Sequence, residues 1–337
     1  FLPSLKDPAA ARWLEEALPR LCPAAVVNAT AFSGRSGAAS PLDAAGVPVF
    51  QVIHATSDRA SWAEAARGLS PSDLAMHVAL PEVDGRIAAG VIAFKDRTAP
   101  DPDLQFAGQA HRADPDRIAA TVARVAAWHR LATTPAAEKR LALILSTYPG
   151  KVHRMAHAVG LDALASAEAI AADLADAGHD APPGAPLTGA LCDTIRWPLA
   201  EYLAALQTLP EDLRAALIRT HGAPERDPAL RDGAFAFAAT LRGKLLIALQ
   251  PERSPATDRE GEYHDMERLP SHAYVAFYLW LRQGFGADAL IHLGAHGTLE
   301  WLPGKAAALS ATCWPEALAG ALPVLYPFIV NDPGEAA

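Results

Sequence analysis

The sequence has few cysteines, no long apolar run and no excess of positive charge, and each shortage excludes a class of protein. Its three cysteines, Cys22, Cys192 and Cys313, form no CxxC pair, which argues against a disulfide framework and against a zinc–thiolate site. No stretch approaches the roughly 20 apolar residues that a membrane-spanning helix needs. A net charge of -9 disfavours binding to nucleic acid. We therefore expect a cytoplasmic protein that binds neither nucleic acid nor a membrane.

The composition is that of a folded protein, with 51% hydrophobic and 20% charged residues. A length of 337 residues suits two domains, because single cores stop growing at roughly 250–300 residues. The chain begins at Phe1 and ends in NDPGEAA, and we expect it to be a segment of a longer protein.

Short buried strands alternate with amphipathic helices along the chain. This alternation predicts an α/β fold, with two or more Rossmann-like parallel-sheet domains and helices on both faces of each sheet. The boundary falls near PAAEKR, which predicts domains at 1–137 and 138–337. The expected strands lie at 24–32, 48–54, 141–150, 244–251, 287–294 and, as an edge strand, 322–330, and the expected helices at 8–21, 116–132 and 159–178.

Two turns resemble phosphate-binding loops only weakly. GRSGAAS, residues 34–40, lacks the GK[ST] of a P-loop and the three glycines of a dinucleotide fingerprint, so we interpret it as a surface turn. TYPGKVHR follows a predicted strand, and its Lys151, His153 and Arg154 could meet an anion there, although an ordinary turn is the alternative. The sequence contains no machinery for hydrolysing ATP.

The strongest motif is ALIHLGAHGTLEWLPGK, in which His292, His296 and Glu300 follow one another at four-residue intervals. The intervening Gly294 and Gly297 disfavour a continuous helix, so we predict a strand, a glycine turn and then a short helix or loop. Ligands of open α/β sheets bind at the carboxyl edge of the strands, where this motif would lie.

Imidazole and carboxylate groups suit divalent metals such as Co²⁺ and Zn²⁺, and a buried carboxylate also suits proton abstraction. The alternative is that His292 is a core histidine and that Glu300 caps a local turn. For His292 alone we favour the core. For His296 and Glu300, which lie between glycines and a Pro-Gly-Lys turn, we favour a functional site.

Other polar and aromatic clusters are open to two interpretations. EYHDMERLPSHAY (262–274) and VNDPGE (330–335) hold histidines and carboxylates, but Asp and Asn in such positions usually make turn hydrogen bonds. The aromatic residues of 273–285 are typical of core packing. Trp280 and Trp301 could alternatively wall a flat apolar ligand.

The string from HLGAHGTLEWLPGK to VNDPGE, residues 292–335, closely resembles the core of the large chelatase subunits. This family comprises the CobN subunit of aerobic cobaltochelatase and the H subunit of magnesium chelatase. Further stretches at 70–86 and 148–166, together with the first 20 residues and the lead-in to the motif, are similar to the cobalt enzyme. The resemblance therefore covers nearly the whole chain. The Ala-Leu-Ser and Cys313 after Pro-Gly-Lys, and the Val-Asn-Asp-Pro-Gly-Glu end, favour the cobalt branch.

The resemblance implies a tetrapyrrole-binding subunit that inserts Co²⁺ into hydrogenobyrinic acid a,c-diamide, a corrin precursor, during cobalamin biosynthesis. ATP would be hydrolysed by a partner AAA+ ATPase subunit, which acts with a further subunit that carries an integrin-I-like domain. That division of labour fits the missing P-loop. The family's C-terminal part would lie beyond Ala337, and this segment alone would be inactive.

The resemblance and the chemistry of metal insertion also imply roles for individual residues. Glu300 would accept protons or hand over the metal, and His296 and His292 would be transient metal ligands or partners of the base. The ring would be bound by residues around the motif and near the end of the chain, namely Trp301 on its face, Lys305 on a peripheral carboxylate, and Asn331 and Asp332.

Three other functions remain open on the sequence alone. One is the H subunit of magnesium chelatase, which inserts Mg²⁺ into protoporphyrin IX. Another is a non-catalytic tetrapyrrole carrier. The third is a metal-dependent hydrolase, which would need three metal ligands and an open water position.

Overall fold

A computed structural model describes residues 4–35, 39–146, 161–253, 265–294 and 299–327. Contacts divide the chain into two compact units. Unit 1 comprises residues 1–129 and 305–310, and unit 2 comprises residues 130–304 and 311–337. The separately folding domains 1–137 and 138–337 stay a prediction.

Unit 1 is built on a four-stranded sheet with the order β1-β2-β3-β4. The first three strands are parallel, and β4 returns antiparallel to β3. Its elements are α1 (Pro8–Leu21), β1 (Val26–Asn28), η1 (Pro41–Ala45), β2 (Val49–Ala55), α2 (Arg59–Glu64), α3 (Pro71–Leu74), η2 (Ala75–Ala79), α4 (Leu80–Val83), β3 (Ile87–Arg97), β4 (Gln109–Ala113) and most of α5 (Pro115–Thr133).

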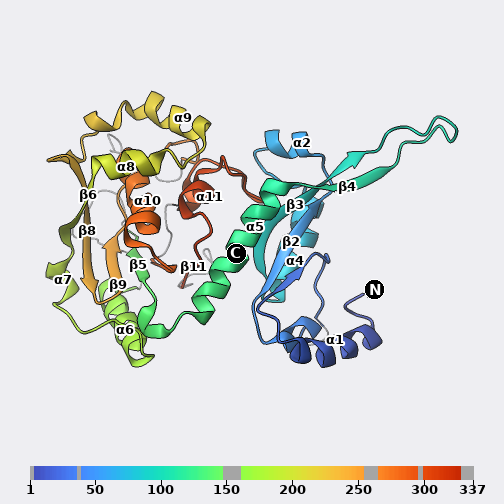
Figure 1. Cartoon of the computed structure of the whole chain (residues 1–337), viewed down its shortest axis with the longest axis horizontal. Coiled ribbons are helices and arrows are strands. Elements are labelled where there is room, and N and C mark those ends of the chain that lie inside the picture. Colours follow the sequence, from blue (N-terminus) through green and yellow to red (C-terminus); the bar gives the residue numbers. More distant parts are fainter. Residues whose placement is uncertain (1–3, 36–38, 147–160, 254–264, 295–298, 328–337) are drawn as a thin grey trace. The chain divides into compact units, whose positions relative to one another are not determined.

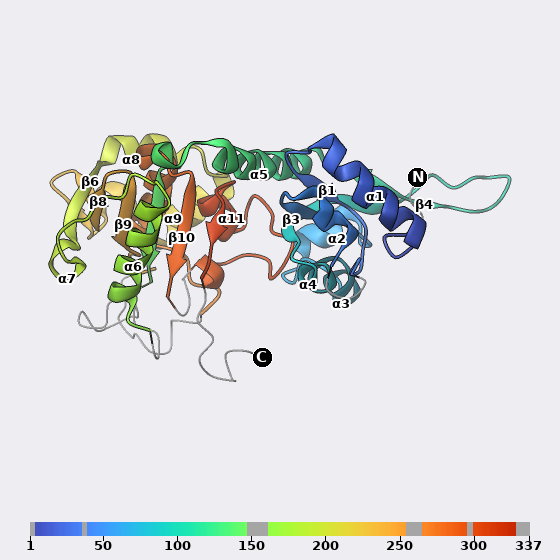
Figure 2. The ribbon, with the colours of Figure 1, turned by 90° about the horizontal axis from the view of Figure 1, so that it is seen from below.

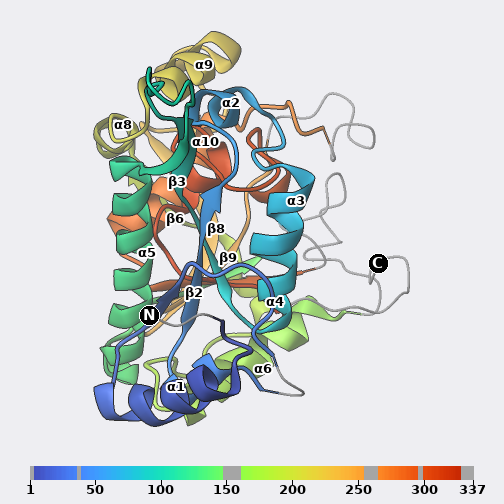
Figure 3. The same ribbon diagram turned by 90° about the vertical axis from the view of Figure 1, so that its right-hand side faces the viewer.

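Helices cover both faces of this sheet, as Figure 3 shows with α5 on one side and α3 and α4 on the other. Phe50 and Val52 of β2 pack against Val125 and Trp128 of α5. On the other face, Trp62 of α2 packs in a cluster with residues of β2 and β3. Alternate β2 side chains therefore enter two separate cores, as expected for a buried parallel strand.

Unit 2 contains a seven-stranded sheet with the path β11-β10-β5-β9-β8-β6, from which β7 pairs with β8. Strands β11, β10, β5 and β9 are parallel, whereas β8 is antiparallel to both β9 and β6. Its elements are η3 (Ala136–Glu138), β5 (Leu141–Leu145), α6 (Ala163–Asp176), α7 (Leu187–Ala190), β6 (Cys192–Pro198), α8 (Leu199–Leu206), α9 (Glu211–His221), η4 (Pro224–Arg226), β7 (Leu230–Arg231), β8 (Ala234–Arg242), β9 (Leu245–Leu249), α10 (His272–Leu279), η5 (Trp280–Phe285), β10 (Ala289–Leu293), η6 (Leu299–Trp301), α11 (Trp314–Ala319) and β11 (Val324–Leu325).

Helices cover the two faces of the larger sheet unequally (Figure 1). Helix α6 packs small residues, Ala163, Ala167 and Ala171, against β5, β9 and β10, so it lies close to the strands. The other face carries the larger core, to which α8, α10 and α11 contribute aromatic side chains and α9 contributes Leu213 and Leu217. Figure 2 shows α6 beside the parallel strands β9 and β10, between which β5 lies in the sheet.

The predicted α/β fold, with parallel sheets and helices on both faces, is confirmed. The strand predicted at 322–330 is an edge strand, β11, for which the pairing extends over two residues. Helix α6 ends at Asp176, two residues before Gly178, which has φ +87° and is the last residue of the helix predicted at 159–178. The sequence did not predict the antiparallel β4, whose side chains are all exposed and carry no hydrophobic pattern. In the described part of the chain, no helix is long and apolar enough to cross a membrane.

Candidate functional site

The motif strand β10 ends beside two other parallel strands at the carboxyl edge of the unit 2 sheet. His292 pairs in register with Ile144 of β5, and β5 pairs in turn with β9. Main-chain hydrogen bonds continue past the strand ends, from Ser146 N to the carbonyl of Leu293 (3.0 Å) and from Gln250 N to the carbonyl of Leu145 (2.9 Å). The predicted place of the motif is therefore confirmed for its first histidine.

His292 lies in a buried polar network and is 3% exposed. Its Nε2 is 3.3 Å from the amide nitrogen of Gln250 and 3.5 Å from the hydroxyl of Tyr278. The same amide nitrogen donates to the hydroxyls of Tyr278 (2.5 Å) and Tyr274 (3.2 Å). Among the described residues, Nδ1 of His292 has no hydrogen-bond partner. The network holds the ring by one nitrogen and leaves the other without a partner.

Burial lowers the pKa of His292 from 6.5 to about 4, because a charged imidazole would lose its hydration there. Burial also raises the pKa of the Tyr278 hydroxyl. Both groups are therefore neutral at physiological pH. A neutral imidazole is the form that binds metals.

Gly294 closes the strand through a very close approach to Ser146. Its φ is +152°, and a Cβ built on it would lie 1.6 Å from the Ser146 Oγ. Only a glycine fits both the backbone and the space at this point. The first glycine of the motif is therefore required by the packing of β10 against the end of β5.

Glu300 and Trp301 lie on a short 3₁₀ helix, η6, so the predicted strand followed by a short helix is confirmed for the described residues. The main-chain carbonyl of Trp301 accepts a hydrogen bond of 2.7 Å from the guanidinium of Arg253, and the next residue, Leu302, is buried in the unit 2 core. Glu300 itself is exposed. The burial that would favour proton abstraction by Glu300 is therefore not supplied by the described residues of this chain.

Lys305 packs in unit 1. Its ammonium donates to the main-chain carbonyls of Ala63 and Ala65, each at 2.8 Å, and lies 5.2 Å from the centroid of the Trp62 ring. At least two of its three N–H groups are therefore directed at the protein. The described structure thus gives the Lys305 ammonium contacts within unit 1, and its contact with a substrate carboxylate stays a prediction.

Several predicted residues lie outside the described parts of the chain, so the proposed His292–His296–Glu300 trio is not tested. Within the described residues, no group of three His, Cys, Asp or Glu side chains is arranged to hold a metal ion. The undescribed candidates are His296, Asn331, Asp332 and Glu335, the basic cluster Lys151, His153 and Arg154, and the loop residues Tyr263 and His264.

A second group of histidines occurs in unit 1. The rings of His54 and His111 are 5.4 Å apart, and burial, together with the repulsion of neighbouring imidazoles, lowers the pKa of His54. Desolvation also lowers the pKa of His77. These three side chains are not among any described set that could hold a metal. These histidines lie outside the HxGxHGxxEWxPGK motif, so we do not assign the functional site to them.

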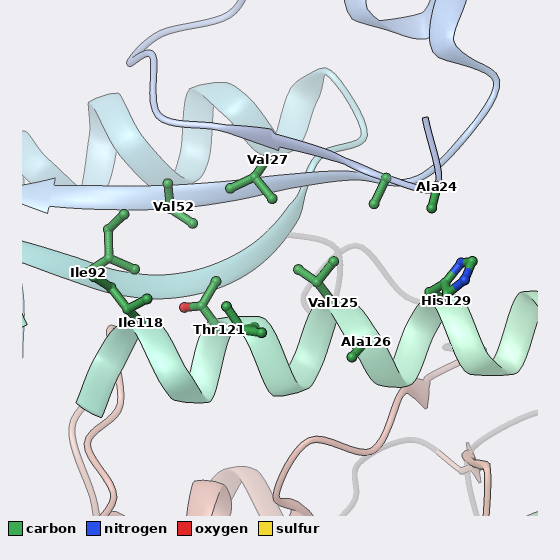
Figure 4. Close-up of a pocket in the computed structure, with 11 residues that line it drawn as sticks. Ala24, Val27, Val52, Ile92, Ile118, Thr121, Val125, Ala126 and His129 are labelled. Carbon is green, nitrogen blue, oxygen red and sulfur yellow. The ribbon is translucent and has the colours of Figure 1, made fainter. Parts of the chain in front are cut away.

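An apolar groove of about 390 Å³ lies between α5 and the sheet of unit 1 (Figure 4). Ile118 and Val125 of α5 face Val27 and Val52 of the strands, and His129 lies at one end. Val27 is 53% exposed, so the groove is an open apolar surface. A lining with a single titratable side chain cannot supply the ligands and bases that metal chemistry needs.

Sequence reasoning did not single out Gln250, Tyr278, Arg253 or Trp62. Gln250 directly follows a predicted strand, which is a usable signal for a residue at the ligand edge. Tyr274 and Tyr278 are four residues apart on one helical stretch, and their hydroxyls could have indicated a buried polar partner. No local signal marks the contacts of Trp62 with Ala308 and Lys305, because both residues lie about 240 positions away in the chain.

Comparison with known proteins identifies the family of this chain. The CobN/Magnesium Chelatase family model matches residues 4–337. The chain belongs to the CobN/magnesium chelatase family.

Within this family, the chain is 40% identical to the CobN subunit of the aerobic cobaltochelatase of Pseudomonas aeruginosa, over 100% of this chain and 28% of that protein. It is 28% identical to the magnesium-chelatase H protein of Rhodobacter capsulatus, over 92% of this chain and 28% of that protein. Among solved structures, the catalytic subunit of cobaltochelatase from Mycobacterium tuberculosis matches with a TM-score of 0.78 and 34% identity, over 98% of this chain and 30% of that one. The chain thus spans less than a third of the length of these relatives.

Proposed function

We propose that this chain forms the metal-inserting part of the large subunit of an ATP-dependent cobaltochelatase. The observation that carries the proposal is His292, the first residue of the HxGxHGxxEWxPGK motif, at the carboxyl edge of the unit 2 sheet, in a chain more similar to CobN than to the magnesium-chelatase proteins. Fold membership alone would not assign a substrate. The higher identity to CobN supports cobalt and a corrin over magnesium and a porphyrin.

The proposed reaction takes Co²⁺, hydrogenobyrinic acid a,c-diamide, ATP and water to cob(II)yrinic acid a,c-diamide, ADP, phosphate and protons. ATP hydrolysis is assigned to a partner AAA+ ATPase subunit, together with a subunit that carries an integrin-I-like domain, because this sequence has no P-loop. We place the reaction in the cytoplasm. The reduced thiols Cys22 and Cys313 are compatible with that compartment.

Metal insertion requires that the inner nitrogens of the ring lose protons and that Co²⁺ is released by the protein. Glu300 is exposed on η6, so a large ligand can reach its carboxylate, and we assign it the role of proton acceptor or last metal ligand. His296 is its proposed partner. His292 is neutral, and its Nδ1 is the ring atom that remains for a metal or a base. These ligands must bind Co²⁺ weakly, because tight binding would prevent transfer.

The ring itself needs flat and polar contacts. Trp301 is proposed to line one face of the tetrapyrrole, since its backbone is held by Arg253 and its position on η6 adjoins Glu300. Asn331 and Asp332 are proposed to contact the ring periphery. The last two assignments rest on the family resemblance of the segment around VNDPGE.

Replacement of Glu300 tests this assignment. In the full-length subunit with its partners, Glu300→Gln keeps the size of the side chain but removes the base, so we expect cobalt insertion to fall by about a hundredfold or more. Corrin binding should persist. The rate is followed by the absorbance change of the corrin. Glu267→Gln, at an exposed carboxylate in the same unit, is the matched control and should retain activity.

An unchanged insertion rate in Glu300→Gln would contradict the catalytic role. A wild-type protein that inserts Mg²⁺ into protoporphyrin IX instead would identify a magnesium chelatase. A protein that binds a tetrapyrrole and inserts no metal even with all partners present would be a carrier.

A further inference from the structure

The groups around His292 decide which of its two ring nitrogens carries the proton. The imidazole is 3% exposed, and its Nε2 lies 3.3 Å from the side-chain nitrogen of Gln250. An amide nitrogen has two hydrogens and no lone pair to offer, so it can only donate, and Nε2 of His292 is the acceptor. Because the neutral imidazole carries a single proton, that proton lies on Nδ1.

The amide of Gln250 is itself held in place. Its side chain is 2% exposed, and its main-chain N donates to the carbonyl of Leu145 at 2.9 Å. The side-chain nitrogen also donates to the hydroxyls of Tyr278 (2.5 Å) and Tyr274 (3.2 Å). Both tyrosines are fully buried on α10, with ring centroids 5.1 Å apart. The end of β9 and one face of α10 therefore fix the donor that faces the histidine.

The Nδ1–H group of His292 has no acceptor among the described residues. Buried donors are almost always paired, because an unpaired N–H group loses its hydration without replacement. The ring of Tyr326, which is 36% exposed, lies beside the imidazole with the two centroids 5.7 Å apart. The donor is thus next to a partly exposed side chain at the carboxyl edge of the sheet, where ligands of α/β sheets bind.

A proton on Nδ1 changes what His292 can do. A metal ion needs a nitrogen lone pair, and the lone pair of this tautomer is on Nε2, which faces Gln250. An N–H group instead binds an acceptor, and an ionised carboxylate is the strongest acceptor that the proposed reaction offers. Such a carboxylate belongs either to Glu300 or to the periphery of the corrin.

We propose that Gln250 and Tyr278 are positioning residues that keep the proton of His292 on Nδ1, so that His292 donates a hydrogen bond to a carboxylate instead of binding Co²⁺. This inference rests on the proposed function. It removes His292 from the set of metal ligands and keeps its role as a hydrogen-bond partner. The two roles differ in kinetics, because a lost metal ligand raises KM for Co²⁺, whereas a lost donor in the transition state lowers kcat.

The test uses the full-length subunit with its partner subunits. His292→Asn keeps an N–H group near the place of Nδ1, whereas His292→Leu keeps neither nitrogen. We expect kcat for cobalt insertion to fall about tenfold to a hundredfold in His292→Leu and less in His292→Asn, with an unchanged KM for Co²⁺ in both. Gln250→Met, which removes the donor to Nε2 at a similar side-chain length, should also lower kcat at an unchanged KM for Co²⁺.

Gln283→Met is the matched control. The Gln283 amide donates to the Thr208 hydroxyl at 3.1 Å on an exposed part of the same unit, so its loss should leave kcat and KM at their wild-type values. The tautomer is measured directly by solid-state ¹⁵N NMR of the histidine-labelled subunit. The signal present in wild type and absent from His292→Asn should be that of an imidazole protonated on Nδ1.

Corrin affinity separates the two sources of the carboxylate. If the acceptor belongs to the corrin, His292→Leu also weakens corrin binding. If the acceptor is Glu300, corrin binding is unchanged, and the loss of kcat in His292→Leu does not add to that in Glu300→Gln.

An active wild type with the His292 proton on Nε2, or an unchanged kcat in His292→Leu, would overturn this inference alone. A raised KM for Co²⁺ in both His292 variants, with no recovery in His292→Asn, would overturn it in favour of a metal ligand. A wild type that carries the proton on Nδ1 but inserts no cobalt into any tetrapyrrole would overturn the proposed function instead.

Discussion

His292 combines a motif position with the environment of a core residue. Its imidazole is almost fully buried, and its Nε2 faces Gln250 and Tyr278. The sequence left two interpretations open for this residue, a core histidine and a metal ligand. The structure shows that it is in the core and neutral, while its role toward a metal stays a prediction.

The lowered pKa of His292 makes a pH-dependent contribution to stability. Below pH 6.5 the unfolded chain takes up a proton at this imidazole, whereas the folded chain resists protonation down to about pH 4. The contribution is therefore complete above pH 6.5 and is lost as the pH falls towards 4. We expect the free energy of unfolding of wild type to fall by about 2 kcal/mol more than that of His292→Gln between pH 7.5 and 5.0.

Urea unfolding of both proteins at the two pH values measures this difference. Because the other histidines are common to both proteins, their titration cancels in the comparison. Equal losses in wild type and in His292→Gln would contradict the burial of a neutral imidazole.

The candidate residues themselves could be predicted from the sequence, but their partners could not. His292 and Glu300 stand in a distinctive string of glycines and histidines. Gln250 and Tyr278 reach His292 from the end of β9 and from α10, and only the folded sheet brings these side chains together. Lys305 was predicted to contact the substrate, and its contacts with α2 could not be predicted, because they join residues far apart in the chain.

At the scale of elements, the end of β10 depends on the approach of Gly294 to Ser146. The strand is completely paired on its β5 side up to Leu293, and the chain must then turn without a side chain. This requirement explains the glycine by packing, independently of any ligand.

Gly294→Ala should destabilise the chain by about 2–4 kcal/mol, because the methyl group would overlap the Ser146 Oγ and the backbone conformation is unfavourable for alanine. Ser146→Gly in the same chain removes the overlapping atoms and should restore part of the loss. Thermal or urea unfolding of the single and double variants measures both effects.

If the stability losses of Gly294→Ala and Ser146→Gly simply add in the double variant, the predicted overlap of the alanine methyl group with Ser146 is contradicted. In that case the cost of the alanine would come from the backbone alone.

Strands β1, β2, β5, β9, β10 and β11 were predicted from the sequence, whereas the parallel β3 and the antiparallel β4, β6, β7 and β8 were not. Strands β2, β5, β9 and β10 are short, buried and rich in aliphatic residues, and the sequence located each of them. The antiparallel β8 pairs with both β6 and β9. Its place in the sheet follows from this long-range pairing, which no local sequence pattern encodes.

At the scale of the whole molecule, the chain represents 28–30% of the length of the cobaltochelatase subunits that it matches. It contains the motif strand β10 in unit 2, and residues 305–310, which follow the motif glutamate along the chain, belong to unit 1. The proposed activity therefore belongs to the full-length subunit with its partners.

The measurement that tests the central claim most directly is tetrapyrrole binding by the full-length subunit, followed by fluorescence quenching. Hydrogenobyrinic acid a,c-diamide and protoporphyrin IX are titrated in parallel, with wild type and with Glu300→Gln. The account predicts tighter binding of the corrin than of the porphyrin, and corrin binding that survives the substitution. Preference for the porphyrin, or binding of neither ligand, would contradict it.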